Sequence, residues 1–269
     1  DKKRSMSFKR IFAVFLRQIL LLKKGHFRLV SLFYWSTLDL VMWGIMSGYL
    51  GTLAGGRISF LATLVGAVIL LSFFFRVQQG IGVAFLEDVY VRNFINLFAS
   101  PLSVNEYILG LIMTSVFDTA ISISFMAALA WFLFSFNIFQ FGLLLIPFIA
   151  VLFMVGWALG LLSVGVVLRF GPSAEIFTWS VPALISPFSA VFYPVSALPT
   201  FLQKVAAFIP NSYVFEGMRA ASLSGSFDAQ KFIAALGLAV VYLLLAYVFL
   251  HRSYKTVLRR GLLARFVTE

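Results

Sequence analysis

Long apolar stretches, separated by short polar or charged connections, dominate the sequence. A helix needs about 20 mainly apolar residues to cross roughly 30 Å of hydrocarbon. Six stretches meet this need with at most one charged residue each, at 29–50, 58–75, 108–131, 142–168, 176–192 and 232–251. A polar break at 135–140 predicts a tight connection between the third and the fourth. The pattern therefore predicts an all-α integral membrane fold with six transmembrane helices.

The N-terminal segment has a different pattern, with apolar residues recurring at helical spacing. They are Phe8, Ile11, Phe12, Phe15, Leu16, Ile19 and Leu20, and basic residues fall mostly between them. A helix with one apolar and one basic side lies flat in the headgroup region, against anionic lipid. We expect an interfacial helix here that contacts membrane lipid, and both a simple anchor and a mechanical role remain open for it.

The connection between the second and third spans, 80–101, predicts a cytoplasmic amphipathic helix. Its apolar face contains Val83, Leu86, Tyr90, Phe94, Leu97 and Phe98, and its polar face contains Asp88, Arg92 and Asn96. Asp88 and Arg92 are four residues apart and so are able to pair. Pro101 ends the run, and Ser103 with Glu106 forms a capping-box pattern for the next span. The helix either docks another protein or is a solvated loop helix without a partner.

A proline-rich segment interrupts the chain at the fifth span. Five of the eight prolines lie between Pro182 and Pro210, and proline removes a backbone donor and clashes with the preceding turn. Interrupted backbone at membrane depth persists only where it is buried in protein or lines a water-filled cavity. We therefore expect the fifth span to end near Tyr193. A short re-entrant or interfacial helix, Thr200 to Ile209, is expected to follow on the outer side.

Composition and charge narrow the class of protein. Hydrophobic residues make up 61% and charged residues 12% of the chain, against about 45–50% and about 25% in soluble domains. A soluble enzyme, a disordered chain and a nucleic-acid binder are excluded on these values and on the mean hydropathy of +1.00. The net charge of +11 reports topology, because 17 of the 21 Lys and Arg residues fall on one side of a six-span chain. Cations gather on the cytoplasmic side, so both termini are expected there.

The domain organisation is simple. Residues 1–5 precede the first Met and are interpreted as a cloning remnant, which leaves 6–269 as a single transmembrane domain. The segment before the first span is long and basic, and it contains no short apolar stretch with a small-residue cleavage site. We therefore expect no cleavable signal peptide.

Groups suited to catalysis or metal binding are sparse. The chain has no cysteine, its two histidines, His26 and His251, lie next to predicted span ends, and no G-x-x-x-x-G-K-[ST] phosphate loop occurs. We therefore expect no metal and no cofactor in this chain. Asp39 and Asp118 lie within spans, where a charge costs about 2.5–3.5 kcal/mol on insertion. Each marks a transport path or proton site, or bonds to a neighbouring group; Asp39, near mid-membrane, is the better functional candidate.

Three local motifs carry a resemblance to a known family. The run NLFASPLSVNEYILG (96–110) follows the amphipathic connection, and the runs FYPVSALP (192–199) and IPNSYVFEGMR (209–219) follow the broken fifth span. In order and spacing they resemble the type-2 permease family of ATP-binding-cassette exporters, over nearly the full chain. Two departures occur. The glycine-threonine-leucine-glutamate turn of many members is missing, and Gly110 is followed by Leu111 where many members have lysine.

The resemblance implies a non-catalytic half-transporter of the bacterial inner membrane. Two such permeases, expected as a homodimer, would enclose a central path, and two separate ATPase subunits, which bind ATP and Mg, would dock on the coupling helix. The expected coupling residues are Glu87, Asp88, Arg92, Asn96, Pro101 and Glu106. The expected path or gate residues are Asp39, Phe192, Tyr193, Pro194 and Pro199. An amphipathic lipid, drug or lipid-linked glycan would move outward; the alternative is an ion-coupled secondary transporter that uses Asp39 and Asp118.

Overall fold

The computed structural model describes residues 6–53, 60–91 and 100–260, and the regular secondary structure in this part of the chain is all helical. Its nine α-helices are α1 (Phe8–Lys24), α2 (His26–Leu53), α3 (Phe60–Tyr90), α5 (Val104–Phe134), α6 (Leu145–Phe170), α7 (Ile176–Ile185), α8 (Thr200–Ala206), α9 (Pro210–Ser224) and α10 (Ala229–Arg259). Short 3-10 turns at Ile138–Leu144, Pro172–Glu175, Pro187–Ser189 and Val195–Ala197 join several of them. The all-α prediction is confirmed.

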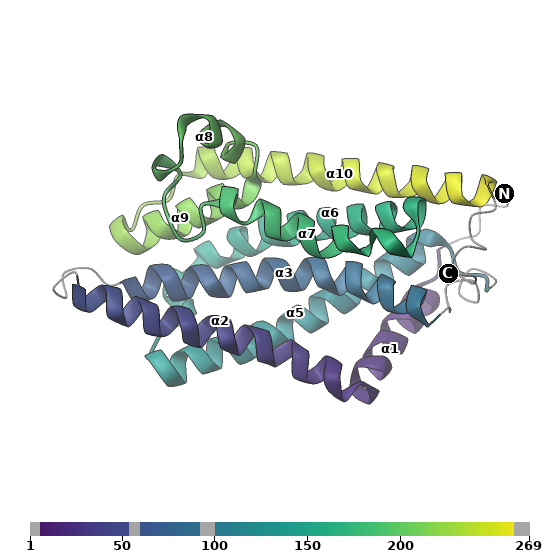
Figure 1. Ribbon diagram of the computed structural model, residues 1–269, viewed down its shortest axis with the longest axis horizontal. Coiled ribbons are helices and arrows are strands. Elements are labelled where there is room, and N and C mark those ends of the chain that lie inside the picture. The colour runs from purple at the N-terminus through teal and green to yellow at the C-terminus, as the bar shows by residue number, and fades with distance from the viewer. Residues whose placement is uncertain (1–5, 54–59, 92–99, 261–269) are drawn as a thin grey trace.

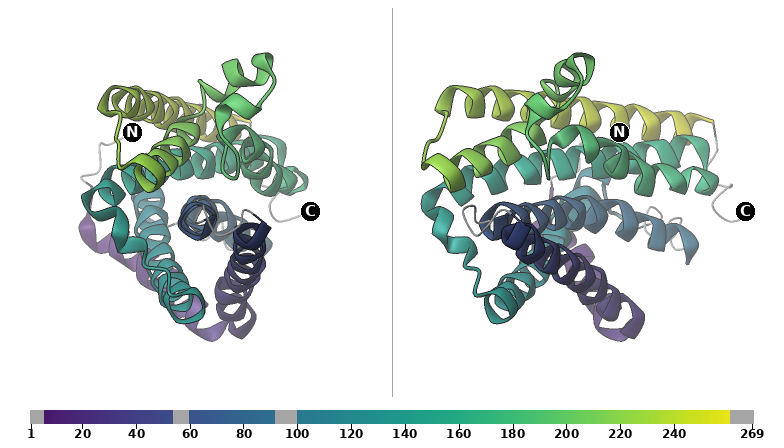
Figure 2. Two further views of the ribbon diagram at one scale, coloured as in Figure 1. Left: turned by 90° about the vertical axis from the view of Figure 1, so that its left-hand side faces the viewer. Right: turned by 60° about the vertical axis from the view of Figure 1, so that its left-hand side comes forward.

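The helices form an elongated bundle (Figure 1). Helices α2, α3, α5, α6 and α10 run along its length, α1 crosses one end, and α8 and α9 gather at the other. Helix α3 lies in the middle of the bundle, with the other long helices around it (Figure 2). In its most apolar stretch 78% of the residues are buried, against 22–33% in the corresponding stretches of α5, α6 and α10. Residues on α3 are therefore surrounded by protein more than those on any of these three helices.

Small residues allow neighbouring helices to approach α3 closely. A Cβ added to Gly80 of α3 would lie 2.6 Å from the Cα of Ser115 on α5. On α6, Gly156 and Gly160 leave the space that Val77 and Ile81 of α3 fill. Glycines spaced in this way favour packing inside membranes, where close backbone contact replaces the hydrophobic driving force.

Four helical segments are long and apolar enough to cross a membrane within the described ranges. They are Thr63–Tyr90, Val104–Phe134, Ile138–Phe170 and Ala229–Arg259. These correspond to the predicted second, third, fourth and sixth spans. Helix α2 covers the predicted first span, and α7 lies at the predicted fifth, so the chain is a multi-pass membrane protein whose six-span topology remains a prediction.

The structure corrects the prediction for the connection after the second span. Helix α3 continues without a break to Tyr90, so 80–90 is the end of a long helix and not a separate amphipathic one. Arg76 directly follows the predicted second span, 58–75, and is therefore counted among the cytoplasmic cations, but it lies in the middle of α3. Without Arg76, the number of Lys and Arg residues predicted on the cytoplasmic side falls by one, and that side still has most of them. Arg92 and Asn96 lie outside the described residues.

The proline-rich segment also differs in detail. Helix α7 ends at Ile185 and not near Tyr193, because Pro187 has no backbone N–H with which to continue the helical hydrogen bonds. Ala190 then adopts a left-handed conformation, with φ of 54°, and turns the chain. The predicted helix Thr200 to Ile209 ends at Ala206, and Pro210 begins α9, an element that the sequence did not predict.

Candidate functional site

Three groups of side chains lie along the bundle: a cluster beneath α1, a cavity at mid-bundle and a cluster on α9. The α1 cluster consists of Ser7, Arg10, Arg17, Asp88, Ser103, Glu106 and Tyr107. Asp88, near the end of α3, is fully buried. The guanidinium of Arg17 donates to both carboxylate oxygens of Asp88, with 3.1 Å between Nη1 and Oδ2. The Tyr107 hydroxyl donates to Oδ2 at 2.7 Å. This carboxylate therefore joins α1, α3 and α5.

Glu106 forms the second half of the α1 cluster, and it too is fully buried. Its Oε1 accepts from the backbone N–H of Ser7 at 2.7 Å and from Nε of Arg10 at 2.8 Å. Its Oε2 accepts from the backbone N–H and the hydroxyl of Ser103, both at 2.9 Å. The predicted capping box of Ser103 and Glu106 is confirmed. The Glu106 carboxylate also binds the start of α1, and the sequence around Glu106 does not predict this contact.

Close packing of α1 accompanies these bonds. Ile11, Val14, Gln18 and Leu22 form its buried face. A Cβ on Gly110 of α5 would lie 2.5 Å from the Cβ of Val14, so the glycine that ends the 96–110 motif is needed for α1 to pack this closely. Phe8, Phe12, Leu16 and Leu20 stay exposed on α1. Helix α1 is thus held on α5 and keeps an exposed apolar side, and its position at a membrane interface remains a prediction.

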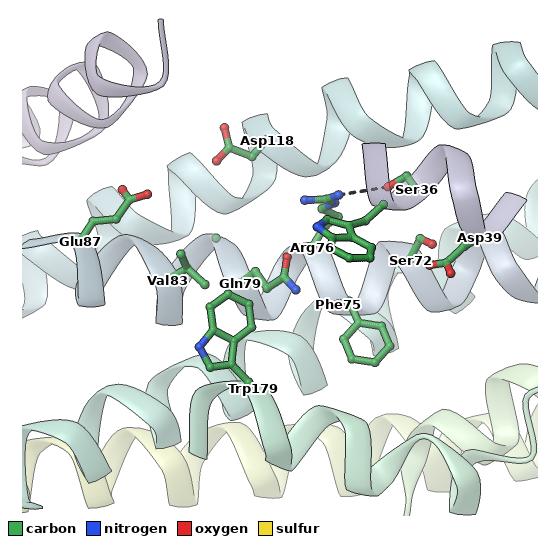
Figure 3. A pocket seen from close by; sticks show the side chains of 12 residues that line it. Ser36, Asp39, Ser72, Phe75, Arg76, Gln79, Val83, Glu87, Asp118 and Trp179 are labelled. Carbon is green, nitrogen blue, oxygen red and sulfur yellow. Dashed lines mark hydrogen bonds between the residues drawn. The ribbon is translucent and has the colours of Figure 1, made fainter. Parts of the chain in front are cut away.

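The mid-bundle cavity is the second group, with a volume of about 440 Å³ between α2, α3, α5 and α7. Its lining residues are Trp35, Ser36, Asp39, Ser72, Phe75, Arg76, Gln79, Gly80, Val83, Glu87, Asp118 and Trp179. The contribution of α3 is a stripe at spacings of three or four residues, from Ser72 to Glu87. Figure 3 shows the indole of Trp179 directed from α7 toward Gln79.

Charges of both signs meet in this cavity. Asp39 of α2, Arg76 of α3 and Asp118 of α5 all line it, so three helices bring these charges to one cavity. Nη2 of Arg76 donates to the Ser36 hydroxyl at 3.1 Å (Figure 3). The guanidinium is also attracted by Asp118 and Asp39. An arginine between two carboxylates is how proteins keep charges at membrane depth, facing the bundle or water and not lipid.

Two of these three charges, Asp39 and Asp118, are candidates predicted from the sequence. Asp39 and Asp118 both line the cavity, and the Thr114 hydroxyl, one turn before Asp118, donates to the Gly110 carbonyl. Arg76 and Gln79 were missed. Ser72, Arg76, Gln79 and Glu87 share one helical face, a signal that becomes visible once the span is allowed to continue past Phe75.

The α9 cluster consists of Arg219, Glu216 and the loop 190–195. Nη2 of Arg219 donates to the carbonyls of Ala190 at 2.9 Å, Val191 at 3.2 Å and Tyr193 at 3.1 Å. Nη1 of Arg219 donates to Glu216 at 2.8 Å, and Glu216 accepts from the N–H of Val195 at 2.7 Å. Two side chains of α9 thus fix the loop that follows α7.

The predicted gate residues lie in or beside this loop. Phe192 stacks on Trp43 of α2, with ring centroids 3.8 Å apart and planes 12° apart. The Tyr193 hydroxyl donates to the carbonyl of Pro187. Pro194 and Pro199 precede the short helices Val195–Ala197 and α8. The loop is therefore tied to α2 as well as to α9.

The coupling residues predicted from the sequence are distributed differently. Asp88 and Glu106 are buried in the α1 cluster and do not face outward. Glu87 lines the mid-bundle cavity, and Pro101 is exposed at the start of α5. The predicted pair of Asp88 with Arg92 lies partly outside the described residues, and Asp88 is bound by Arg17.

Fold and site together define a helical, multi-pass membrane protein. Its charged groups hold helices together or line a cavity, and among the described residues no three His, Asp or Glu side chains gather as a metal site would require. Residues 9–223 match the family model described as ABC-2 type transporter. The chain belongs to this family, as a non-catalytic membrane permease subunit. A search of curated proteins finds no match.

Proposed function

We propose that this permease is one half of an ATP-driven exporter that moves an amphipathic substrate outward between two copies of the chain. The mid-bundle cavity carries the proposal. Asp39 and Trp35, which line it, are exposed on the single chain, and lipid does not solvate a carboxylate at membrane depth. A second copy over this face would enclose the charges in a water-filled path.

The proposed topology has six spans with both termini in the cytoplasm of a bacterial cell. It is supported by the distribution of Lys and Arg and by the position of α1 and the end of α10 at the same end of the bundle (Figure 1). The α1 cluster then lies at the cytoplasmic end, and α8 and α9 lie at the outer end.

ATP and Mg would be bound by two separate ATPase subunits, as the family implies. We place their docking segment at the connection between α3 and α5, where Arg92, Asn96 and Pro101 lie. Asp88 and Glu106 act behind this segment as positioning residues, since they tie α1 to both helices. A push on the connection therefore reaches α1, α3 and α5 together.

At the outer end, the loop 190–195 with α8 and α9 would act as the gate. The stack of Trp43 on Phe192 supports this, because it connects the loop to α2, a wall of the cavity. A displacement of α2 would reach Phe192 and Tyr193 through this contact. Pro194 and Pro199 keep the segment from forming one continuous helix.

Co-purification tests the proposal most directly. The permease, co-expressed with its ATPase subunit, should purify as a complex whose ATP hydrolysis drives export in proteoliposomes. Transport by the permease alone, driven by an ion gradient without any ATPase, would overturn the proposal in favour of a secondary transporter.

The homodimer has its own test, because a chain without cysteine accepts single cysteines cleanly. Met42→Cys lies on the exposed side of α2, one turn from Asp39, and should form a disulfide-linked dimer in membranes. Leu244→Cys, equally exposed on α10, is the matched control and should not. Efficient cross-linking at Leu244→Cys alone would place the interface elsewhere.

A further inference from the structure

Another cavity, which we call the apolar groove, lies between α6 and α10 and has a volume of about 560 Å³. Its lining comes from α6, the end of α7, α8 with the connection to α9, and α10. All of its described lining residues have aliphatic, proline or phenylalanine side chains except Tyr242 of α10. The hydroxyl of Tyr242 donates to the carbonyl of Phe208 at 2.6 Å. The groove therefore offers a ligand almost purely apolar contacts.

Contacts between helices bound the apolar groove along the bundle, and exposed residues mark its opening. Toward the end of α6, the two helices approach so closely that a Cβ added to Gly165 would lie 2.8 Å from Cδ1 of Phe249. Toward α8, the bond from Tyr242 joins α10 to the connection between α8 and α9. Leu245 of α10 and Phe208 both line the groove and are exposed. The groove therefore opens sideways, at the surface of the bundle.

The surface around this opening is strongly apolar. Among the four candidate spans, those that contain α6 and α10 have the highest mean hydropathy, 2.6 each. The lining residues of these helices, at 155–162 and 242–249, stand away from both helix ends. Helices α10 and α2 lie on opposite sides of α3 (Figures 1 and 2), so a second copy over α2 leaves the groove uncovered. On this side of a membrane span, the groove faces lipid hydrocarbon.

Neither water nor a neighbouring helix fits the apolar groove well. An ordered water in a cavity needs about two to four polar partners, and the one hydroxyl among the described lining residues already donates to Phe208. The volume of the groove equals little more than one turn of a helix about 10 Å wide. An acyl chain is thin, flexible and wholly apolar, and each methylene group that it buries strengthens its binding. Left empty, the groove would forfeit the contacts of its walls.

We propose that the apolar groove holds one acyl chain of a membrane phospholipid, from the leaflet at the α8 end of the bundle, as a resident part of the protein. This acyl chain contacts α6, α10 and the residues Val205, Phe208 and Ile209 at and after the end of α8. It thereby fastens the connection between α8 and α9 to two spans, alongside the bond from Tyr242. The inference rests on the membrane location of the protein and not on the proposed export function.

Retention of a lipid probe through detergent extraction tests this proposal. Phosphatidylglycerol that carries a diazirine in one acyl chain is incorporated into membranes that contain the permease alone, and the protein is purified in mild detergent. Lipids at the protein surface exchange for detergent, whereas an acyl chain enclosed in the groove should remain. We expect native mass spectrometry to find a phospholipid on each chain. After irradiation, the probe should be attached mainly within 155–162 and 242–249.

Two neighbouring leucines with almost equal exposure provide a matched pair of variants. Leu245→Trp adds bulk at the opening of the groove, and Leu244→Trp adds the same bulk beside it, outside the lining. Excluding two methylene groups of a buried acyl chain lowers its affinity about tenfold. Retention of the probe should therefore fall by at least this factor in Leu245→Trp and stay unchanged in Leu244→Trp.

A second pair tests the wall beside α8. Phe208→Ala removes a ring that lines the groove, and Phe201→Ala removes a similarly exposed ring of α8 that does not. Retention of the probe should fall in Phe208→Ala only. Because all four side chains are exposed, the variants should fold, and the unfolding temperature in detergent checks that they do.

Equal retention of the probe in Leu245→Trp and Leu244→Trp would overturn the proposal, and so would attachment of the probe mainly to α2 or α5. A disulfide-linked dimer formed by Leu245→Cys in membranes would assign the groove to a second copy of the chain and not to lipid. Because the permease is tested without an ATPase, a failure of the export function leaves these results unchanged. A permease that exports with its ATPase but retains no probe loses only the resident lipid.

Discussion

The α1 cluster and the mid-bundle cavity both set carboxylates beside arginines, but Asp88 and Glu106 of the cluster are buried whereas Asp39 of the cavity is exposed. In the α1 cluster, each of the four oxygens of Asp88 and Glu106 accepts at least one hydrogen bond, and both residues are fully buried. In the cavity, Asp39 is exposed and one guanidinium lies between two carboxylates. The first arrangement is a joint between helices, and the second leaves capacity for a ligand.

Desolvation explains why this difference separates structure from function. Burying a charge costs several kcal/mol, and only well-formed bonds to all of its atoms offset the loss of water. The α1 cluster meets this condition with two arginines, two hydroxyls and two backbone N–H groups. A carboxylate that stays partly hydrated carries a smaller cost and can exchange its water for another cation. Substitutions in the two regions should therefore affect different properties.

The largest loss of stability is expected for Asp88→Ala. It leaves Arg17 without its buried partner and removes the acceptor of Tyr107. Breaking a buried ion pair costs about 3–5 kcal/mol, and we expect the lower end because the Arg17 side chain is 26% exposed and able to hydrate. Thermal unfolding in detergent measures the loss, and protease sensitivity of α1 should rise with it.

The double variant Asp88→Ala with Arg17→Ala is the control for this prediction. With both charges gone, no uncompensated guanidinium remains, so the double variant should be less destabilised than the sum of the two single ones. Additive losses would show that Asp88 and Arg17 do not act as a pair, and the contrast with the cavity would weaken.

Gly80→Ala should have the next largest effect, at the contact of α3 with α5 between the two regions. The new methyl group would overlap the backbone of Ser115, and overpacking of this kind costs about 1–3 kcal/mol. Gly237→Ala is the control, because nothing lies within 4 Å of its added Cβ. Alanine favours a helix by about 1 kcal/mol over glycine, so the two variants should shift the unfolding temperature in opposite directions. A shift of the same sign would contradict the packing of α3 on α5.

Ser103→Ala should reduce stability less, by about 1 kcal/mol, the usual value of an N-cap. It removes the hydroxyl that accepts from the Glu106 N–H and donates to the Glu106 carboxylate. Arg10 and the Ser7 N–H remain bound to Glu106, so the α1 cluster should persist. Ser103→Thr keeps the hydroxyl and should restore the unfolding temperature. A loss as large as that of Asp88→Ala would mean that the cap, and not the ion pairs, holds the cluster together.

Local patterns predicted the parts of the α1 cluster that are close in sequence. Ser103 and Glu106 are three residues apart, and their capping box follows from that spacing. Arg17 and Asp88 are 71 residues apart, and no periodicity connects them. The sequence offered Arg92 as the partner of Asp88 because it lies one turn away, whereas packing of α1 on α5 brings Arg17 to it.

The cavity could not be predicted from the sequence for a related reason. A charge is costly in hydrocarbon, so the second span is predicted to end at Phe75, directly before Arg76. The cost of burying Arg76 falls because α2 and α5 bring Asp39 and Asp118 to the same cavity, and that depends on how three helices pack. The number and order of the long helices follow from hydropathy, but the depth at which their polar residues meet does not.

Asp39→Asn should have the smallest effect on stability and the sharpest on function. The side chain is exposed on the single chain, and Asn keeps its shape, so we expect a change within about 0.5 kcal/mol in thermal unfolding. Export by the permease with its ATPase should nevertheless fall, since the path loses one of the two carboxylates that face Arg76. Asp228→Asn, which neutralises an exposed carboxylate outside the cavity, should leave both properties unchanged. If Asp39→Asn instead lowers stability as much as Asp88→Ala and leaves export unaltered, Asp39 is a structural residue like Asp88, and the distinction between the two regions fails.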